Sequence, residues 1–154
     1  MKNPFNVKAI NQIGVIVKDA VASAKMLESI LGIGPFQILK RPPEEIIYKE
    51  KKQTFQITNG LAFLGSTQIE LIEVVSGDCC QAEFLRRTGG GLHHIGLFVD
   101  DMDEELAKAK ERGIDVLQTG TAVGAIRWAY LDTEEKYGLV IELMQLGKKK
   151  KKKS

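Results

Sequence analysis

The 154-residue sequence has little cysteine, little histidine and no long apolar run. Its two cysteines, Cys79 and Cys80, are adjacent, and they are too few for a disulfide framework or a four-thiolate metal site. We therefore expect them to pack at the start of a helix rather than to serve a redox role. No segment approaches the roughly 20 apolar residues of a membrane-spanning helix, and the first residues lack the apolar core of a signal peptide. The expectation is a cytoplasmic protein that does not contact membranes.

The positive charge of the chain is concentrated at its end. The formal net charge of +2 includes six consecutive lysines, Lys148 to Lys153. Removing these six from the 22 basic residues leaves 16 against 20 acidic ones, a formal charge of −4. The folded body is therefore expected to offer no basic face for nucleic acid. Residues 148–154 are predicted to be a disordered Lys-rich tail.

Strand-type and helix-type periodicity alternate in the first half of the chain. Residues 9–17 predict a strand, and a helix with an apolar face should follow, beginning at Asp19 and ending at Gly32. The polar stretch 40–52 contains two adjacent prolines and predicts a mobile loop. The remaining strands of this half are expected near residues 36–39, 53–64 and 67–75.

The same order of elements recurs in the second half. A helix beginning at Asp78 should connect the halves, and a second helix is expected from Asp101 to Arg112. Strands are predicted at 92–99, 114–118, 126–131 and 138–145. The pattern predicts an α+β fold with a first βαβββ module (1–76), a connecting helix and Gly-rich loop (77–91) and a second βαβββ module (92–147).

The two halves also share sequence. "QIGVIVKD" at 12–19 aligns with "HIGLFVDD" at 94–101, and "IEL" occurs at 69–71 and again at 141–143. Superposing the halves places Gln12 on His94 and Glu70 on Glu142. Because side chains alternate along a strand, each of these four residues lies opposite the apolar face of its strand. Four polar side chains should therefore share one face of the sheet.

These four side chains together favour a metal site. Two buried carboxylates would repel each other and be desolvated unless a cation neutralised them. One imidazole, two carboxylates and one amide oxygen suit Zn²⁺, Ni²⁺, Co²⁺ or Mn²⁺ with room for water. Each residue alone is unremarkable on a strand, but their equivalent positions in the repeat favour a shared role. His94 is the predicted ligand, whereas alternation points His93 to the other side and favours a structural role for it.

The motif "HHIGLFVDD" and the two "IEL" strands resemble the vicinal-oxygen-chelate superfamily, which includes glyoxalase I and methylmalonyl-CoA epimerase. The likeness covers about residues 8–146, and "FLRRTGGGLHHIGLFVDDMDEEL" most resembles the epimerase-like branch. The resemblance implies that the two modules form an eight-stranded cup. It also implies that Gln12, Glu70, His94 and Glu142 hold the metal. This set is the one found in animal-type glyoxalase I, whereas epimerases usually have histidine in place of Gln12.

The resemblance further implies an activity. A divalent metal would polarise two neighbouring substrate oxygens and stabilise an enediolate, while Glu142 or Glu70 moves a proton. An epimerase-like reaction on a thioester is favoured over glyoxalase I (lactoylglutathione lyase) isomerisation of a thiohemiacetal. Epimerases of this kind can use a second carboxylate base from the strand before the first "IEL". Here that strand, 53–64, contains no Asp or Glu, so the sequence does not predict a two-base reaction.

Other interpretations stay open. The cup could instead be a binding module that sequesters a small molecule without catalysis. Arg127 could pair with a substrate carboxylate or phosphate, although a surface salt bridge is the commoner role for such a residue. The thiol carrier of the substrate is not indicated. A homodimer is expected, because a cup leaves sheet edges and apolar helix faces that a symmetric partner can cover.

Overall fold

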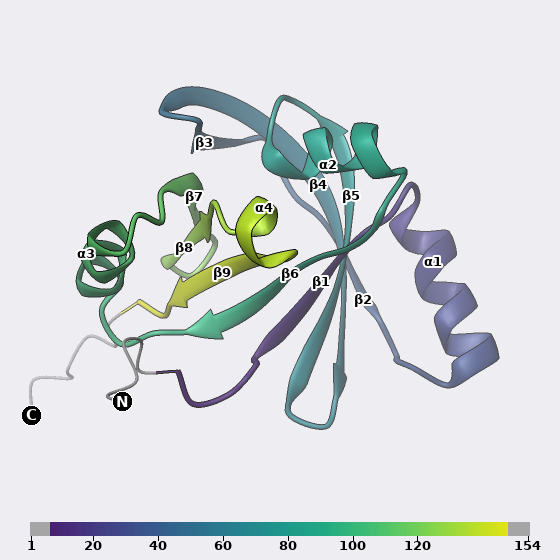
Figure 1. Ribbon diagram of the computed structural model, residues 1–154. Helices are drawn as coiled ribbons and strands as arrows, with labels where there is room; N and C mark the ends of the chain where they lie inside the picture. The colour runs from purple at the N-terminus through teal and green to yellow at the C-terminus, as the bar shows by residue number, and fades with distance from the viewer. Residues whose placement is uncertain (1–6, 148–154) are drawn as a thin grey trace, which may run out of the picture.

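The computed structural model describes residues 7–147, in which nine strands form one sheet with the order β2-β4-β3-β7-β8-β9-β6-β1-β5. Strand β4 also pairs with β5, so eight strands close into a ring and β2 lies beside β4 outside it. Helices lie around this ring (Figure 1). The fold is therefore the mixed α+β, eight-stranded cup expected from the sequence. The predicted tail, 148–154, lies outside the described residues.

The first half of the chain supplies the adjacent ring strands β1, β5, β4 and β3, and the second half supplies the other four. Its elements are β1 (Gln12–Ile16), α1 (Ala20–Met26), the π-helical turn η1 (Leu27–Leu31), β2 (Gln37–Lys40), β3 (Glu44–Tyr48), β4 (Lys51–Leu64) and β5 (Thr67–Ser76). The connecting helix and second half follow as α2 (Cys80–Thr88), β6 (Gly91–Phe98), α3 (Met102–Glu111), β7 (Val116–Ala122), β8 (Ile126–Leu131), α4 (Glu134–Tyr137) and β9 (Val140–Gln145).

The strands of the two halves pair in the same way. β1 runs parallel to β5, and β6 runs parallel to β9. The registers also match, since Gly14 pairs with Glu70 in the first half and Gly96 pairs with Glu142 in the second. β1 and β6 are antiparallel and join the halves. The repeat read from the sequence is therefore present in the backbone, residue for residue, at the strands that carry the candidate site.

The prediction of a mobile loop over 40–52 was wrong, because β3 occupies 44–48. This strand forms a hairpin with β4 and then pairs with β7 through Ile47 and Tyr48, which closes the ring. Ile46 and Tyr48 are buried on its inner side. The hairpin turn uses Lys49 and Glu50, both with positive φ, where glycine or asparagine is the usual sequence signal. The adjacent prolines lie just before β3 and not within it.

Most helix boundaries follow their capping residues. Asp19 accepts from the backbone N–H of Ala22 at 2.8 Å, and Asp101 accepts from that of Glu104 at 3.0 Å, as their positions predicted. Asp78 was predicted to begin α2, but Cys79 caps that helix. Both cysteines are buried at the helix start, which confirms the packing role.

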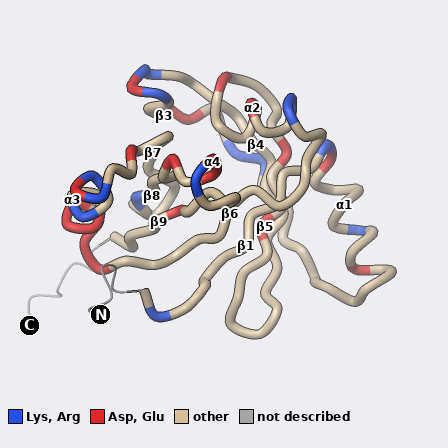
Figure 2. Tube along the Cα trace, in the orientation of Figure 1, with Lys and Arg blue, Asp and Glu red and all other residues tan. Residues whose placement is uncertain are grey.

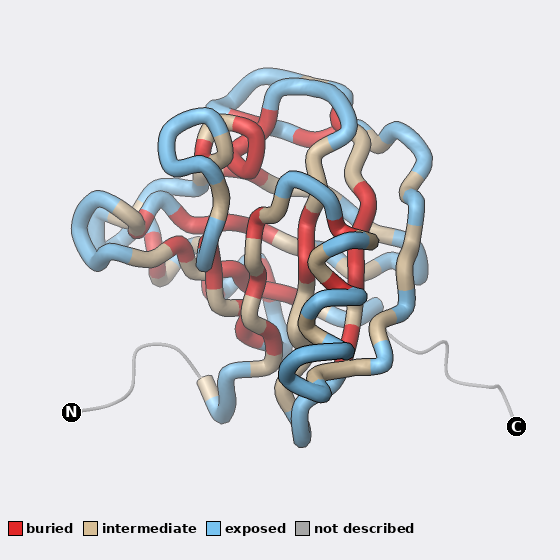
Figure 3. Tube along the Cα trace, turned by 90° about the vertical axis from the view of Figure 1, so that its right-hand side faces the viewer, coloured by how far each residue is buried: buried red, intermediate tan, exposed pale blue. Residues whose placement is uncertain are grey.

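Helix α3 has acidic residues in its first turn and basic residues in its last, an order that complements the helix dipole (Figure 2). It also packs Met102 and Ala109 into the core formed with β6, β8 and β9. Buried positions run along the strands, while the outer faces of the helices and the hairpin tips are exposed (Figure 3). Within 7–147, no helix combines the length and apolar character needed to cross a bilayer.

Candidate active site in the cup

The four candidate ligands come together from four adjacent strands. Gln12 lies on β1, Glu70 on β5, His94 on β6 and Glu142 on β9, and these strands are neighbours in the order β9-β6-β1-β5. The Nε2 atom of His94 is 3.3 Å from the Gln12 Oε1, 3.3 Å from the Glu142 Oε2 and 3.6 Å from the Glu70 Oε2. Residues separated by up to 130 positions thus present one imidazole, two carboxylates and one amide to a common point.

Two glycines make this convergence possible. A Cβ on Gly14 would lie 1.9 Å from the Cε1 of His94, so the imidazole occupies the space that a side chain at position 14 would need. A Cβ on Gly96 would lie 2.9 Å from the Cβ of Gln12 and 2.7 Å from the Cε of Met144. Each module therefore supplies a glycine over which the other module's residue crosses. The "IG" shared by the two halves is the sequence signal for this arrangement, and its significance was not recognised in the sequence.

The electrostatics of the cluster favour a positive charge at its centre. Burial and the nearby Glu142 raise the pKa of Glu70 to about 7, although His94 and Arg41 oppose this shift. Burial lowers the pKa of His94, but the Glu142 and Glu70 carboxylates outweigh that effect and raise it overall. The Oε2 of Glu142 is buried and makes no hydrogen bond. A buried carboxylate oxygen whose partner is an imidazole nitrogen 3.3 Å away is costly to desolvate, and a cation beside it would offset that cost.

The donor set therefore suits a divalent ion in its chemistry. A mixed set of nitrogen and oxygen donors is typical of catalytic sites that keep positions open for water or substrate. Within residues 7–147, no group of three or more His, Cys, Asp and Glu side chains is placed so that it could hold a metal ion. The fourth donor of this cluster is an amide, and Glu70 is partly engaged by Asn59, which donates to its Oε1 at 2.9 Å.

His93 does not point away from His94, so the prediction from strand alternation was wrong. The pairing of β1 with β6 slips between Gly14 and Val15, which pair with His94 and Leu92, and His93 is the extra residue of this bulge. Its Nδ1 lies 3.0 Å from the Nδ1 of His94. Burial, His94 and Arg87 lower the pKa of His93 to about 3. A neutral imidazole thus sits behind the one that faces the carboxylates.

A cavity of about 230 Å³ is lined by three of the four residues, Gln12, Glu70 and Glu142. Its walls are mostly apolar and aromatic, including Trp128 and Tyr130 from β8. Two charged residues of the wall, Arg41 and Glu44, come from the stretch that the sequence predicted as a loop. Because β3 was not foreseen, neither residue was singled out from the sequence. The cavity is large enough for a small acyl group, with the candidate ligands on one side.

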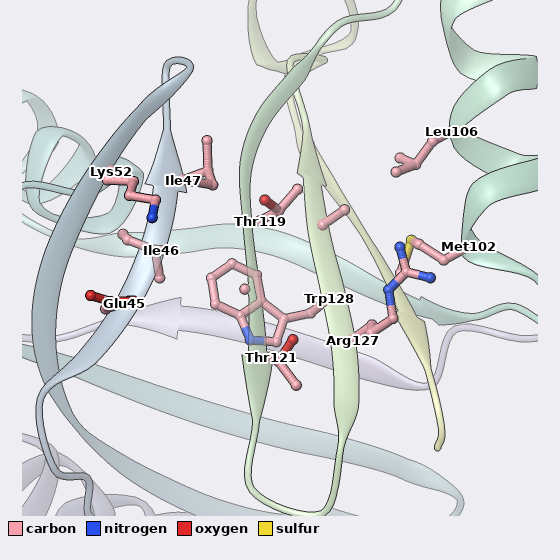
Figure 4. Close-up of a pocket in the computed structure, with 12 residues that line it drawn as sticks. Glu45, Ile46, Ile47, Lys52, Met102, Leu106, Thr119, Thr121, Arg127 and Trp128 are labelled. Carbon is pink, nitrogen blue, oxygen red and sulfur yellow. The ribbon is translucent and has the colours of Figure 1, made fainter. Parts of the chain in front are cut away.

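Arg127 is not part of this cluster. It lines a separate pocket of about 380 Å³ beside α3, in which Trp128 lies between Arg127 and the β3 and β4 residues Glu45 and Lys52 (Figure 4). Two of its guanidinium nitrogens donate to Asp103 at 2.7 and 3.2 Å. Arg127 therefore forms a surface salt bridge with Asp103, the commoner role expected from the sequence for such a residue. Its role in substrate binding stays a prediction.

The fold and the matching family model agree. The model for the Glyoxalase/Bleomycin resistance protein/Dioxygenase superfamily matches residues 11–131. The chain belongs to this superfamily, as its motifs suggested.

The particular relatives include epimerases. The chain is 25% identical to the mitochondrial methylmalonyl-CoA epimerase of Bos taurus over 144 residues, 92% of this chain and 76% of that protein. It is 22% identical to the uncharacterized Bacillus subtilis protein YqjC over 138 residues, 88% of this chain and 91% of that protein. The solved structure of a Streptomyces coelicolor methylmalonyl-CoA epimerase variant in complex with 2-nitronate-propionyl-CoA superposes with a TM-score of 0.67 at 20% identity, covering 93% of this chain and 97% of that one. This structural likeness shows the shared fold.

Proposed function

We propose that the protein is a divalent-metal-dependent enzyme that moves a proton at the carbon beside a thioester carbonyl, as methylmalonyl-CoA epimerase does. The observation that carries the proposal is the convergence of Gln12, Glu70 and Glu142 on the Nε2 of His94. The buried Oε2 of Glu142 supports it, because its contact is the ion pair with His94 at 3.3 Å and a bound cation would offset the cost of burying it. The similarity to methylmalonyl-CoA epimerases favours this reaction among those of the superfamily.

In this proposal Gln12, Glu70, His94 and Glu142 would hold the metal. When bound, a divalent ion would polarise the substrate oxygens and stabilise the charge that develops as a carbon acid loses its proton. His94 would face the ion through Nε2, with its Nδ1 hydrogen-bonded to the Nδ1 of His93. Zinc, nickel, cobalt and manganese are all compatible with this donor set.

Glu142 is the proposed proton carrier. Its carboxylate lies at the edge of the cavity, and its Oε2 is committed to no hydrogen bond. The apolar wall near Trp128 and Tyr130 would exclude water from the reacting carbon. Glu70 is the next candidate, although its Oε1 already accepts from Asn59.

A third carboxylate lines the cavity besides Glu70 and Glu142, although the strand expected to carry a second base contains no Asp or Glu. Glu44 on β3 is part of the wall, and burial raises its pKa while Arg41 opposes the shift. An epimerase that moves protons on two faces of one carbon needs two such groups. Glu44 is therefore the proposed second proton carrier, in place of any residue on β4.

Metal analysis and isotope exchange test the proposal together. Protein purified without chelator or a nickel column is supplemented with Co²⁺ or Ni²⁺ and analysed for metal, and a filled site is expected because four donors are already gathered. Exchange of the substrate α-proton with deuterated solvent is then followed by NMR on methylmalonyl-CoA. Less than about 0.2 metal per chain, with no exchange, would favour the non-catalytic binding module instead.

A glyoxalase I-like isomerisation is the second candidate, and Gln12 favours it. An amide at this position matches the ligand set of animal-type glyoxalase I, as the resemblance of the sequence implied. The methylglyoxal–glutathione adduct is the test substrate. Turnover of this adduct without exchange on methylmalonyl-CoA would replace the epimerase proposal with the isomerase one.

A further inference from the structure

The backbone of Arg41 is fixed at the wall of the cavity. Its N–H donates to the carbonyl oxygen of Ile57 at 3.0 Å, and its own carbonyl accepts from the Nε2 of Gln56 at 3.0 Å. Pro42 and Pro43 follow directly and restrict the chain further. The base of this side chain is therefore held as firmly as a strand residue, although it lies beyond the end of β2.

The guanidinium of Arg41 is also held, but only through one nitrogen. Its Nε donates to the Oδ1 of Asn59 at 3.1 Å, and the Nδ2 of the same amide donates to Glu70 at 2.9 Å. Within residues 7–147, no hydrogen bond or ion pair engages its two Nη groups. A guanidinium carries five N–H donors in a planar fork, so four of them are available on a group whose orientation is set.

Arg41 is the one basic side chain among the described residues of the cavity wall. Glu44 shares that wall, yet no ion pair joins it to Arg41. The positive charge is therefore close to the candidate reaction centre, linked to Glu70 through a single amide, and it is not neutralised by a direct partner. An oriented guanidinium with free donors is the arrangement that binds carboxylates in a bidentate manner.

We infer that Arg41 binds a carboxylate carried by the acyl group of the substrate, and so selects thioesters whose reacting carbon bears a carboxylate over those in which it does not. This inference rests on the proposed function and deepens it. The Arg41–Asn59–Glu70 chain fixes where the carboxylate sits relative to the candidate ligands. The thiohemiacetal of methylglyoxal has no carboxylate at its reacting carbon, so the same residue disfavours that substrate.

Binding of two coenzyme A esters tests the inference. Methylmalonyl-CoA and propionyl-CoA differ by the carboxylate alone, and each is titrated calorimetrically into the wild type, Arg41→Gln and Arg41→Lys. Arg41→Gln should weaken methylmalonyl-CoA binding about 10- to 100-fold, the usual cost of losing charge-assisted hydrogen bonds, and should leave propionyl-CoA within about twofold. The affinity of Arg41→Lys for methylmalonyl-CoA should lie between those of the wild type and Arg41→Gln, because lysine keeps the positive charge without the planar pair of donors. Arg86→Gln is the matched control, since Arg86 is exposed and pairs with Asp78 away from the cavity.

The outcomes separate the inference from the proposed function. Equal loss of both esters in Arg41→Gln, or a fall in metal content, would make Arg41 a positioning residue for Glu70 and overturn carboxylate selection. Unchanged binding of both esters would also overturn it, while proton exchange by the wild type would leave the proposed function standing. If the wild type binds neither ester, the proposed function fails. Free methylmalonate and propionate then replace the esters, and a preference for methylmalonate that Arg41→Gln abolishes would still support the inference, whereas no such preference would overturn it.

Discussion

The two modules share a backbone register but differ in the side chains placed on it. Gly14 pairs with Glu70 in the first module just as Gly96 pairs with Glu142 in the second. Each module nevertheless contributes a different donor, the Gln12 amide in one case and the His94 imidazole in the other. The repeated register brings four donors to one point, and the departures from the repeat decide what chemistry that point can support. The repeated strand register therefore accounts for the placement of the four donors, and the difference between Gln12 and His94 accounts for the mixed donor set.

The two carboxylates show this difference most clearly. Glu70 is 14% exposed in its side chain and accepts from Asn59, whereas Glu142 is 6% exposed and its Oε2 has no hydrogen bond. The equivalent of Asn59 on β8 is Trp128, since these residues pair with Ile72 and Met144, two positions beyond the respective glutamates. The first module therefore holds its glutamate with an amide, whereas the second places its glutamate beside an apolar wall, with the Oε2 3.3 Å from the Nε2 of His94.

The largest effect on α-proton exchange is expected when the carboxylate of Glu142 is replaced by an amide. Glu142→Gln keeps the shape of the side chain but removes the base, so α-proton exchange on the accepted substrate should fall about 10²- to 10⁴-fold. Glu70→Gln should cost about tenfold or less, because the amide oxygen can still accept from Asn59. NMR exchange rates and metal content are measured for both variants. A greater loss in Glu70→Gln would reverse the assigned roles of the two modules.

The paired glycines give the next comparison. Gly14→Ala places a methyl group 1.9 Å from the ring of His94, which is packed against Tyr130 at 4.9 Å between ring centroids. We expect a loss of about 1–3 kcal/mol or more in the free energy of unfolding, as for other overpacked sites. Gly96→Ala meets the flexible Cε of Met144 at 2.7 Å and the Cβ of Gln12 at 2.9 Å, a smaller overlap than at Gly14, and should cost less. Urea unfolding measures both, and equal losses would contradict the unequal packing of the modules.

The sequence predicted the parts of the fold that depend on local period and on the repeat. Strand alternation placed Gln12, Glu70, His94 and Glu142 on one face, because a period of two leaves no freedom once the register is set. The β3 strand was missed because its turn uses Lys49 and Glu50 in left-handed conformation, without the glycine or asparagine that signals such turns.

The remaining features of the site depend on tertiary placement. A bulge at His93 overrides alternation and brings two imidazoles together, and no local sequence feature distinguishes that bulge from a regular strand. Arg41 follows a short strand and precedes two prolines, so its sequence context suggests a loop. Its role emerges only when β4 brings Asn59 beside it. Local patterns therefore predicted the candidate ligands, while the other residues that line the cavity required the fold.

The helices of the modules differ in how far they are covered, which bears on the predicted homodimer. Helix α3 buries Met102 and Ala109, whereas the end of the first helix exposes Ile30 at 70% and Leu31 at 64%. If a symmetric partner covers this face, Ile30→Glu should raise the dimer dissociation constant at least tenfold, about 1.4 kcal/mol. Val123→Glu is the control, because Val123 is equally exposed on the second module. Light scattering measures both, and a monomeric wild type at about 50 µM would refute the dimer.

The smallest effect concerns β3, which pairs with β4 in the first module as β7 pairs with β8 in the second. The Tyr48 hydroxyl and the Lys49 ammonium both donate to Glu83 on α2, which fixes the end of β3 to the connecting helix.

Hydrogen bonds from Lys49 and Tyr48 lower the pKa of Glu83, so this carboxylate binds protons less tightly in the folded state than in the unfolded one. Its contribution to stability should therefore be present above the unfolded pKa, about 4.3 for glutamate, and be lost as the pH falls through the folded value. Because Glu83 is 46% exposed, solvent screening limits the contribution to about 1 kcal/mol or less. Urea unfolding of the wild type and Glu83→Gln should show a small deficit in the variant at pH 7, and this deficit should shrink at a pH below the unfolded pKa of about 4.3. A deficit of equal size at both pH values would mean that the shape of the side chain, and not its charge, holds β3 against α2.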